Sequence, residues 1–323
     1  MREIQLAVIT NSFNRRDLLG QALPSLLEAL RDMPFASCIV VFDAGSKDGS
    51  QDYVREMAAK NPDVPVHLIE PDPPAAGSFA DGCNQAVAHA LRQHPSVKWC
   101  FFYETDNLLP NHEALREAVR LLEDNPSLAG TGFTVEKRDG AKAGFGCALP
   151  GVAGFLAGQQ LSARLHLDDM VLRDWQTTPR GVRWAHCDVV YTSPLLIRAE
   201  AWTRVGGMDV KLFPFTDSDV DLCWKVRNAG WRFAILDMPG VVHDNDSTPS
   251  AWSSRRVLWY HQSRMRLLRK YHGAGVELLK PLLFARHLVE WLLLAPRALF
   301  SARARQSLHT RAMLLGRVFH GYE

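Results

Sequence analysis

Apolar runs alternate with segments of helical hydrophobic spacing along the first part of the chain. Strands alternating with helices of this length form βαβ units, whose right-handed crossovers place the loops after the strands at one sheet edge. The pattern predicts an α/β fold, Rossmann-like, with a mostly parallel central sheet flanked by helices. The expected strands are residues 6–13, 38–42, 64–69 and 97–107, and the expected helices are residues 15–31, 51–60, 79–93 and 113–124.

The run at residues 97–107 ends in acidic residues. We expect a strand buried on both faces, with Glu104 and Asp106 at its carboxyl end, where open α/β sheets bind ligands. Alternate residues of an extended segment share a side, so the two carboxylates suit one divalent cation, or one cation and one sugar hydroxyl. The structural alternative is a strand end that simply enters solvent.

Two further polar segments are candidates for the same edge. Asp43 ends a predicted strand and begins a loop rich in small residues, Asp43-Ala-Gly-Ser-Lys-Asp-Gly-Ser50, in which it can accept the ring N–H of a pyrimidine or simply form a turn. Asp217, Asp219 and Asp221 crowd the start of a helix expected from Asp221 onward. One such residue explains a helix cap, whereas three leave a carboxylate available as a base.

Charge divides the chain unevenly. Its 323 residues are 47% hydrophobic and carry a net charge of +2, which is ordinary for a globular protein. Residues 252–323 hold thirteen Lys or Arg and three acids, so the remaining residues carry a net charge of about −8. We expect a catalytic domain at residues 1–251 and a basic amphipathic helical extension at 252–323. The extension suits an anionic membrane surface, or packing on the catalytic domain or on a second subunit as a homo-oligomer. No nucleic-acid-binding motif accompanies the charge.

The cysteines and the apolar segments indicate the compartment. The six cysteines are far apart and show no metal-binding spacing, which favours a reducing compartment. The first residues lack a signal-peptide core, and residues 281–300 contain too many charges for a membrane span. We expect a cytoplasmic protein, peripheral on the inner face of the cell membrane.

Read together, the motifs resemble the inverting, metal-dependent glycosyltransferases of the GT-A fold, family 2, and among them the bacterial rhamnosyltransferase-like members. The match covers residues 6 to about 250. The matching segments are Ser12-Phe13-Asn14-Arg15, the Asp43–Ser50 loop, Gly77 to Asn84, Glu104-Thr105-Asp106, Gly206-Gly207-Met208-Asp209, Ser218-Asp219-Val220-Asp221-Leu222 and His243.

The resemblance implies a nucleoside diphosphate sugar donor, a UDP- or dTDP-sugar such as rhamnose, and a glycan or lipid-linked glycan acceptor in bacterial surface polysaccharide assembly. It implies Mg²⁺ or Mn²⁺ held by Asp106 and His243, with Asp219 as the base and Asp217 in reserve. The nucleotide-sugar site it implies comprises Ser12, Phe13, Arg15, Asp43, Gly77, Asp81, Glu104 and Thr105.

Two departures from the family pattern leave a second function open. Glu104 replaces the first Asp of the metal motif, and Ser218 replaces the Glu before the base. A non-catalytic sugar-nucleotide-binding or assembly subunit of the same fold is the alternative. The Gln-x-x-Arg-Trp segment and membrane helices of the processive synthases are missing from the sequence, which favours a single-addition transferase.

Overall fold

The computed structural model of the protein describes residues 3–71, 77–136, 142–144, 146–167, 172–243 and 252–323. The chain divides into two compact units. Unit 1 comprises residues 1–148, 170–214 and 218–245, and unit 2 comprises residues 149–169, 215–217 and 246–323. The boundary expected at residue 251 falls near the last of these divisions, and unit 2 also takes in two earlier segments.

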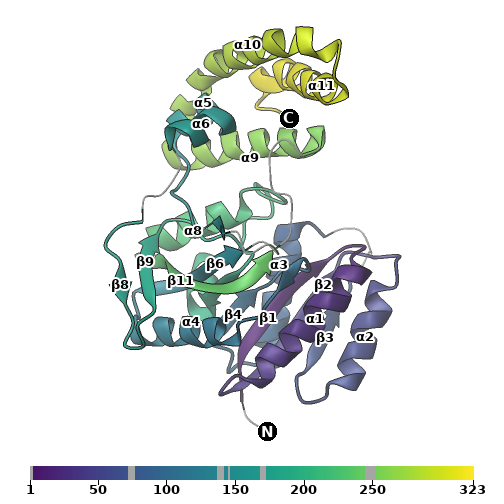
Figure 1. The fold of residues 1–323 in the computed structure, drawn as a ribbon, viewed down its shortest axis with the longest axis vertical. Helices are drawn as coiled ribbons and strands as arrows, with labels where there is room; N and C mark the ends of the chain where they lie inside the picture. The colour runs from purple at the N-terminus through teal and green to yellow at the C-terminus, as the bar shows by residue number, and fades with distance from the viewer. Residues whose placement is uncertain (1–2, 72–76, 137–141, 145, 168–171, 244–251) are drawn as a thin grey trace. The chain divides into compact units, whose positions relative to one another are not determined.

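Unit 1 is built on one mixed sheet (Figure 1). Its parallel part has the order β3-β2-β1-β4, formed by β1 (Ile4–Ser12), β2 (Ala36–Asp43), β3 (Val66–Ile69) and β4 (Trp99–Phe102). The sheet continues from β4 through β10 (Leu195–Arg198), β6 (Leu128–Glu136), β11 (Arg232–His243), β9 (Arg183–Cys187) and β8 (Gln176–Thr177). Two short strands lie off this path, β5 (Asn107–Leu108) on β11 and β7 (Lys142–Gly144) on β6.

Helices cover both faces of this sheet. The main core cluster joins α1 (Arg16–Arg31), α2 (Ser50–Lys60) and α4 (His112–Asp124) to one face, where Ile39 and Val41 of β2 are fully buried. Helix α3 (Phe79–Gln93) packs against β1 and β2, and α7 (Ala199–Val205) and α8 (Ser218–Asn228) contact β10 and β11. The predicted α/β class with flanking helices is confirmed.

The strand predicted at residues 97–107 is shorter than expected. It ends at Phe102 because the chain turns back on itself: the Asn107 amide donates to the Glu104 carbonyl at 3.1 Å. The buried Tyr103 hydroxyl closes the same turn by donating to the Asn107 carbonyl at 2.8 Å. Glu104 and Asp106 therefore lie in a turn between β4 and β5. The expectation that they share one side of an extended strand was wrong.

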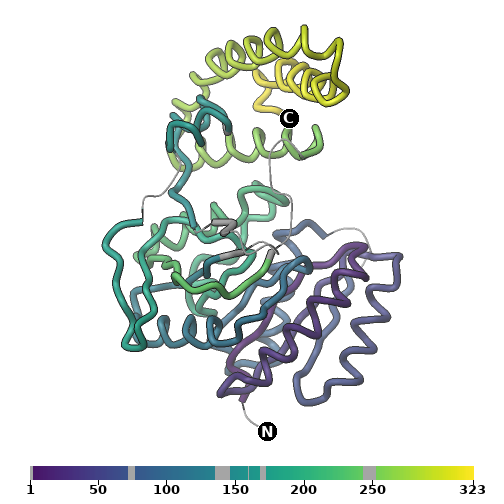
Figure 2. Tube along the Cα trace, in the orientation of Figure 1, coloured from purple at the N-terminus to yellow at the C-terminus, as the bar shows by residue number. Residues whose placement is uncertain are grey.

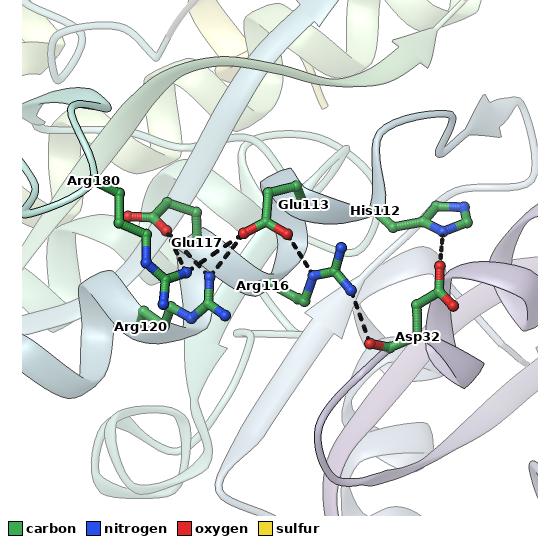
Figure 3. A network of polar contacts seen from close by, with 7 residues as sticks. All are labelled: Asp32, His112, Glu113, Arg116, Glu117, Arg120 and Arg180. Carbon is green, nitrogen blue, oxygen red and sulfur yellow. Dashed lines mark hydrogen bonds and ion pairs between the residues drawn. The ribbon is translucent and has the colours of Figure 1, made fainter.

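A polar network fixes α4 to the end of α1 (Figure 3). His112 at the start of α4 contacts the Asp32 carboxylate at 2.6 Å, and its hydrogen bond lowers the pKa of Asp32. Further along α4, the nearly buried Glu117 lies 3.5 Å from both Arg120 and Arg180. The network ties α4, which packs against β6 and β11, to the end of α1.

Unit 2 is helical. Its helices are α5 (Val152–Ala157), α6 (Gln159–Leu165), α9 (Ser254–His272), α10 (Lys280–Ala298) and α11 (Ala302–Arg317), with short 3-10 turns at Ala274–Leu279 and Val318–His320. Phe155 of α5 packs in one core cluster with Met265 and Leu314. The segment containing α5 thus lies beside the C-terminal helices although it is far from them in sequence (Figure 2). None of the described helices is both long and apolar enough to span a bilayer.

Candidate functional site

The turn after β1 and the loop after β2 are joined by hydrogen bonds. The Asn14 amide donates to the Ser46 hydroxyl at 2.7 Å, and the Arg16 amide donates to the Asp48 carboxylate at 2.9 Å. Hydrogen bonds from the Ser50 hydroxyl and then from the Arg16 amide lower the pKa of Asp48. The turn after β1 (residues 12–16) and the loop after β2 (residues 43–50) are therefore joined at the carboxyl edge of the sheet. We call these two segments together the ledge.

Asp43 shapes its own loop. Its side chain is 1% exposed and lies beside Ser12, its register partner across β1 and β2. Its carboxylate accepts hydrogen bonds from the amides of Gly45 and Ser46, from the Ser46 hydroxyl at 2.6 Å and from Gln51 at 2.9 Å. The turn-forming role of Asp43 is thus realised, and any bond to a nucleotide base would be made in addition to it.

The neighbouring side chains differ in what they offer a ligand. The Ser12 hydroxyl is buried and faces no hydrogen-bond partner among the described residues. Phe13 is 57% exposed, which is unusual for a large aromatic ring. Arg15, also exposed, precedes α1. A buried hydroxyl beside an exposed aromatic face suits a planar ring that is stacked on one side and hydrogen-bonded at its edge.

Glycines let α3 approach the sheet closely. A Cβ atom on Gly77 would lie 2.6 Å from the Phe42 ring, and one on Gly82 would lie 2.2 Å from the Asn11 amide oxygen. Ser78 caps the helix, and Asp81 in its first turn accepts a hydrogen bond from Gln85 at 2.7 Å. The close packing brings Gly77 and Asp81 to the same edge as Asp43.

We expect Gly82→Ala to destabilise the protein by about 1–3 kcal/mol, because the new methyl group would overlap Asn11 and Phe42 where α3 packs against β1 and β2. Gly20→Ala is the matched control, since Gly20 lies inside α1 and its Cβ would meet only the flexible end of Arg16. That change should be neutral or stabilise by up to about 1 kcal/mol. Urea unfolding measures both, and equal free energies of unfolding for the two variants would contradict the packing argument.

Asn84 joins α3 to the Gly206-Gly207-Met208-Asp209 segment. Its side-chain amide donates to the Met208 carbonyl and accepts from the Met208 amide, both at 2.9 Å. Gly207 has a φ of +64°, and a Cβ there would lie 2.5 Å from the Asn84 oxygen. Asn84 belongs to the matching segment Gly77 to Asn84, but the sequence alone indicates no role for it. Its partner lies more than a hundred residues away, which local spacing does not reveal.

Two acidic groups from distant motifs act electrostatically on one thiol of α3. Cys83 is buried, and burial raises the pKa of its thiol, with the carboxylates of Glu104 and Asp219 adding to the effect. The Asn11 amide also donates to its sulfur at 3.0 Å. Thr105, beside Glu104, is 7% exposed. The fold thus brings the acidic turn after β4 and the start of α8 to the same place.

Helix α8 begins earlier than expected. Its first residue is Ser218, so Asp219 and Asp221 both lie in its first turn and not in an extended entry. Residues two apart on a helix point about 200° apart, so these two side chains lie on different sides of α8. Asp221 is fully buried and lies 3.8 Å from Lys225, whereas Asp219 is half-buried and accepts a bond from the Val220 amide. Asp219 is therefore the more accessible of the two acids.

Asp217 is held by an ion pair within unit 2. Both of its oxygens accept hydrogen bonds from the Arg264 guanidinium of α9, at 2.9 and 3.1 Å. The side chains of Asp217 and Arg264 are 5% and 10% exposed. With both oxygens bonded to a buried guanidinium, the Asp217 carboxylate has no oxygen turned freely toward an acceptor hydroxyl.

The register of β5 and β11 places the two predicted metal ligands close along the backbone. His243 pairs with Asn107, the residue after the half-buried Asp106. The side chain of His243 lies outside the described residues. A carboxylate on a turn next to a histidine position, with Glu104 in the same turn, is a donor set that suits Mn²⁺ or Mg²⁺. The residue types at these backbone positions therefore suit the expected ion.

Comparison with known proteins decides the family. A model of the glycosyltransferase-like family 2 matches residues 4–262. The chain belongs to this family. The match spans the strands, the ledge and the acidic segments described above, and the protein is a glycosyltransferase.

Solved structures agree on the GT-A fold. A mannosyltransferase from Pyrobaculum calidifontis, solved with GDP-mannose and Mn²⁺, is 17% identical over 99% of this chain and 86% of its own, with a TM-score of 0.56. GalNAc-T7, solved with UDP, GalNAc and Mn²⁺, is 13% identical over 83% of this chain and 48% of its own, with a TM-score of 0.55. Residues 1–349 of TarS from S. aureus are 14% identical over 98% of this chain and 92% of that one, with a TM-score of 0.50. No curated protein matches in sequence.

Proposed function

We propose that this glycosyltransferase is metal-dependent and inverting, and that it moves one sugar from a nucleoside diphosphate sugar to a hydroxyl of a glycan or lipid-linked glycan. The observation that supports the proposal is that the carboxylates of Glu104 and Asp219, from two distant motifs, both act electrostatically on the Cys83 thiol of α3. A candidate donor-side acid and a candidate base thus influence the same group.

The donor base is proposed to lie on the ledge. Phe13 offers an exposed ring for stacking, and the Ser12 hydroxyl and the Asp43 carboxylate offer edge contacts. Such contacts suit the pyrimidine of a UDP- or dTDP-sugar, with rhamnose as one candidate sugar. Arg15, Gly77 and Asp81 would line the path from the base toward Glu104 and Thr105.

The diphosphate is proposed to lie near Asp106 and His243, which would hold Mg²⁺ or Mn²⁺. The bound ion would neutralise the charge that develops on the leaving diphosphate. Structural relatives solved with Mn²⁺ support the use of a divalent ion. Glu104, a longer acid than the aspartate usual in this motif, would reach a sugar hydroxyl or the ion from the same turn.

Asp219 is proposed to act as the general base. It would take the proton of the acceptor hydroxyl while that oxygen bonds to the anomeric carbon, and the bond from this carbon to the diphosphate oxygen would break on the opposite face. The configuration at the anomeric carbon is then inverted. The accessible position of Asp219 in the first turn of α8 supports this role over Asp217 and Asp221.

A donor screen tests the proposal. The purified protein is incubated with UDP-, dTDP- and GDP-sugars in Mn²⁺ or in EDTA, with water as the default acceptor, and released nucleoside diphosphate is measured. We expect slow, Mn²⁺-dependent release from one nucleotide class, and proton NMR should show the inverted anomer first. Metal-independent release, or a first product with retained configuration, would overturn the proposal.

Unit 2 is proposed to adsorb to an anionic lipid surface. The C-terminal helices expose large apolar side chains, including Leu292, Leu293 and the 90% exposed Phe300, while their residues carry an excess of positive charge. Apolar side chains next to cationic ones match the interface of a membrane rich in anionic lipid. This placement would bring the enzyme to a lipid-linked acceptor.

Replacing Arg297, Arg303 and Arg305 with Glu should weaken binding to liposomes that contain phosphatidylglycerol by at least about tenfold, since each basic residue near such a surface is worth about 1 kcal/mol. Replacing Arg31, Arg55 and Arg92 of unit 1 in the same way is the control and should leave binding unchanged. Flotation assays at low and high salt measure the effect. Binding insensitive both to these charges and to salt would contradict the proposal, and dimer formation in its place would assign the apolar face to a second copy.

A further inference from the structure

Three histidines and a cysteine gather in unit 1 on side chains that the proposed reaction does not use. Cys38 lies on β2, His67 on the neighbouring strand β3, and His89 and His94 on and just after α3 (Figure 1). The sulfur of Cys38 and ring nitrogens of His67 and His94 lie within 4.8 Å of one another. Among the described residues, no other three Cys, His or acidic side chains form such a group.

The fold explains why these residues meet. Ile39 and Val41 point into the core on the α1 side, so Cys38 and Val40 point to the opposite face of β2. His67 pairs in parallel register with Val40 and therefore shares that face, which α3 covers. Cys38 precedes Asp43 by five residues, or about 16 Å of strand. The group therefore lies toward the amino edge of the sheet, away from the proposed donor site.

The spacing of the donor atoms matches that of ligands around one ion. The Nε2 atoms of His67 and His94 are 3.2 Å apart. Two nitrogens bound to a tetrahedral zinc at about 2.0–2.1 Å are separated by about 3.4 Å. His89 is not one of the three residues whose donor atoms lie within 4.8 Å of one another. Its ring lies 5.1 Å from that of His67, and its Nε2 is buried without a hydrogen-bond partner among the described residues. A buried nitrogen with no partner is costly unless a ligand uses it.

The histidines are in the form that binds metals, whereas the Cys38 thiol must first lose a proton. Burial and then the neighbouring histidines lower the pKa of His67, and burial lowers that of His89, so both rings are neutral at pH 7. Neutral imidazole is the form that binds metals. Burial raises the pKa of Cys38 to about 12, so its thiol must lose a proton as an ion binds. Without an ion, His67 and His94 can share an N–H···N hydrogen bond.

We propose that Cys38, His67 and His94 bind one divalent transition-metal ion of the zinc type, and that His89, whose ring lies beside that of His67, turns toward the ion as the fourth ligand. One thiolate and three imidazoles are soft and borderline ligands, which prefer Zn²⁺ or Co²⁺ to Mg²⁺. Binding releases the Cys38 proton to solvent, forms one sulfur and three nitrogen bonds to the ion, and changes no oxidation state. The ion enters past His89 and Arg92, which line a surface depression beside α3. With all four positions filled by protein, the ion braces β2, β3 and α3 and performs no chemistry.

Cobalt titration tests this site. Metal-free protein is titrated with Co²⁺, whose bond to a thiolate gives a charge-transfer absorption band that nitrogen and oxygen ligands do not give. We expect the band to saturate at one ion per chain, and Zn²⁺ to abolish it and to raise the melting temperature. Cys38→Ser should remove the band. His67→Gln and His94→Gln should each weaken binding by about 100-fold or more, since losing a direct ligand costs at least as much as losing a residue that supports one.

Two controls separate this site from the others. Cys187→Ser removes a buried thiol of β9 and should leave the band unchanged. Asp106→Asn should also keep the band, because the proposed catalytic ion site contains no thiolate. Should Cys38→Ser fail to fold, His94→Gln at the end of α3 still tests the site, with weaker binding and a retained band. A missing band in the unmodified protein, or a band that persists in Cys38→Ser, would overturn the proposal.

Discussion

Replacing Asp219 with Asn is expected to lower the rate of sugar transfer by about 10²–10⁴-fold while donor binding persists, because the change keeps the volume of the side chain and removes the proton acceptor. Asp219 is half-buried in the first turn of α8, close to Glu104 and Cys83. The rate of nucleoside diphosphate release at saturating donor measures the loss. Titration of the donor in calorimetry measures the retained affinity.

Asp221→Asn serves as the neighbouring control, since Asp221 is fully buried beside Lys225. It should lower stability and leave the activity of the folded fraction within about tenfold of the unmodified enzyme. Near-full transfer by Asp219→Asn, together with loss of transfer in folded Asp217→Asn, would assign the base to Asp217. If neither variant loses activity, the inverting mechanism proposed here is wrong.

Replacing Asp217 with Asn is expected to destabilise unit 2 by about 3–5 kcal/mol, because it leaves the Arg264 charge buried without its counterion. Asn tolerates the left-handed backbone that Asp217 adopts at a φ of +58°, so the change tests the charge and adds little backbone strain. Urea unfolding followed by the fluorescence of Trp259, which lies in the same unit, reports the loss.

Asp63→Asn is the matched control for this ion pair. Asp63 pairs with Arg31 at 2.6 Å, but both side chains are about half exposed, so its loss should cost less than about 1 kcal/mol. Equal costs for the two substitutions would mean that burial does not strengthen the Asp217 pair. A folded Asp217→Asn with unchanged stability and no transfer would contradict a structural role for this residue.

Local patterns predicted the first half of unit 1 well. Helix α3 has the predicted bounds, and β1 and β2 lie within two residues of theirs, because each element carries its own hydrophobic period and ends at Gly, Ser or charged residues. The expectation that the loops after these strands share one edge of the sheet followed from the preference for right-handed crossovers. These features depend on residues that are neighbours in the sequence, so a single sequence is enough to predict them.

Features that depend on distant contacts were missed. The hydrogen bond from Asn107 to Glu104 ends β4 before the acidic residues, and no hydrophobic period records it. The segment that contains Phe155 belongs to unit 2 because its apolar side chains pack with α9 and α11. Cys38 and His67 are nearly thirty positions apart, so the sequence showed no metal-binding spacing, yet adjacent strands bring them together.

The site residues themselves remain predictions. The structure brings Ser12 and Asp43 to one ledge and Glu104 and Asp219 to one thiol. The roles of these residues rest on the family pattern and on the chemistry of their side chains.

The central claim is that a nucleoside diphosphate and a divalent ion bind together at the carboxyl edge of the sheet. The most direct measurement is the melting temperature of the protein with UDP, dTDP or GDP, each with and without Mn²⁺, in the unmodified chain and in Asp106→Asn. Saturation at about 100 times Kd adds about 2.7 kcal/mol, which raises the melting temperature by several degrees. The account predicts this rise for one nucleotide only when Mn²⁺ is present, and its loss in Asp106→Asn. A nucleotide that stabilises both proteins equally without Mn²⁺ would contradict it.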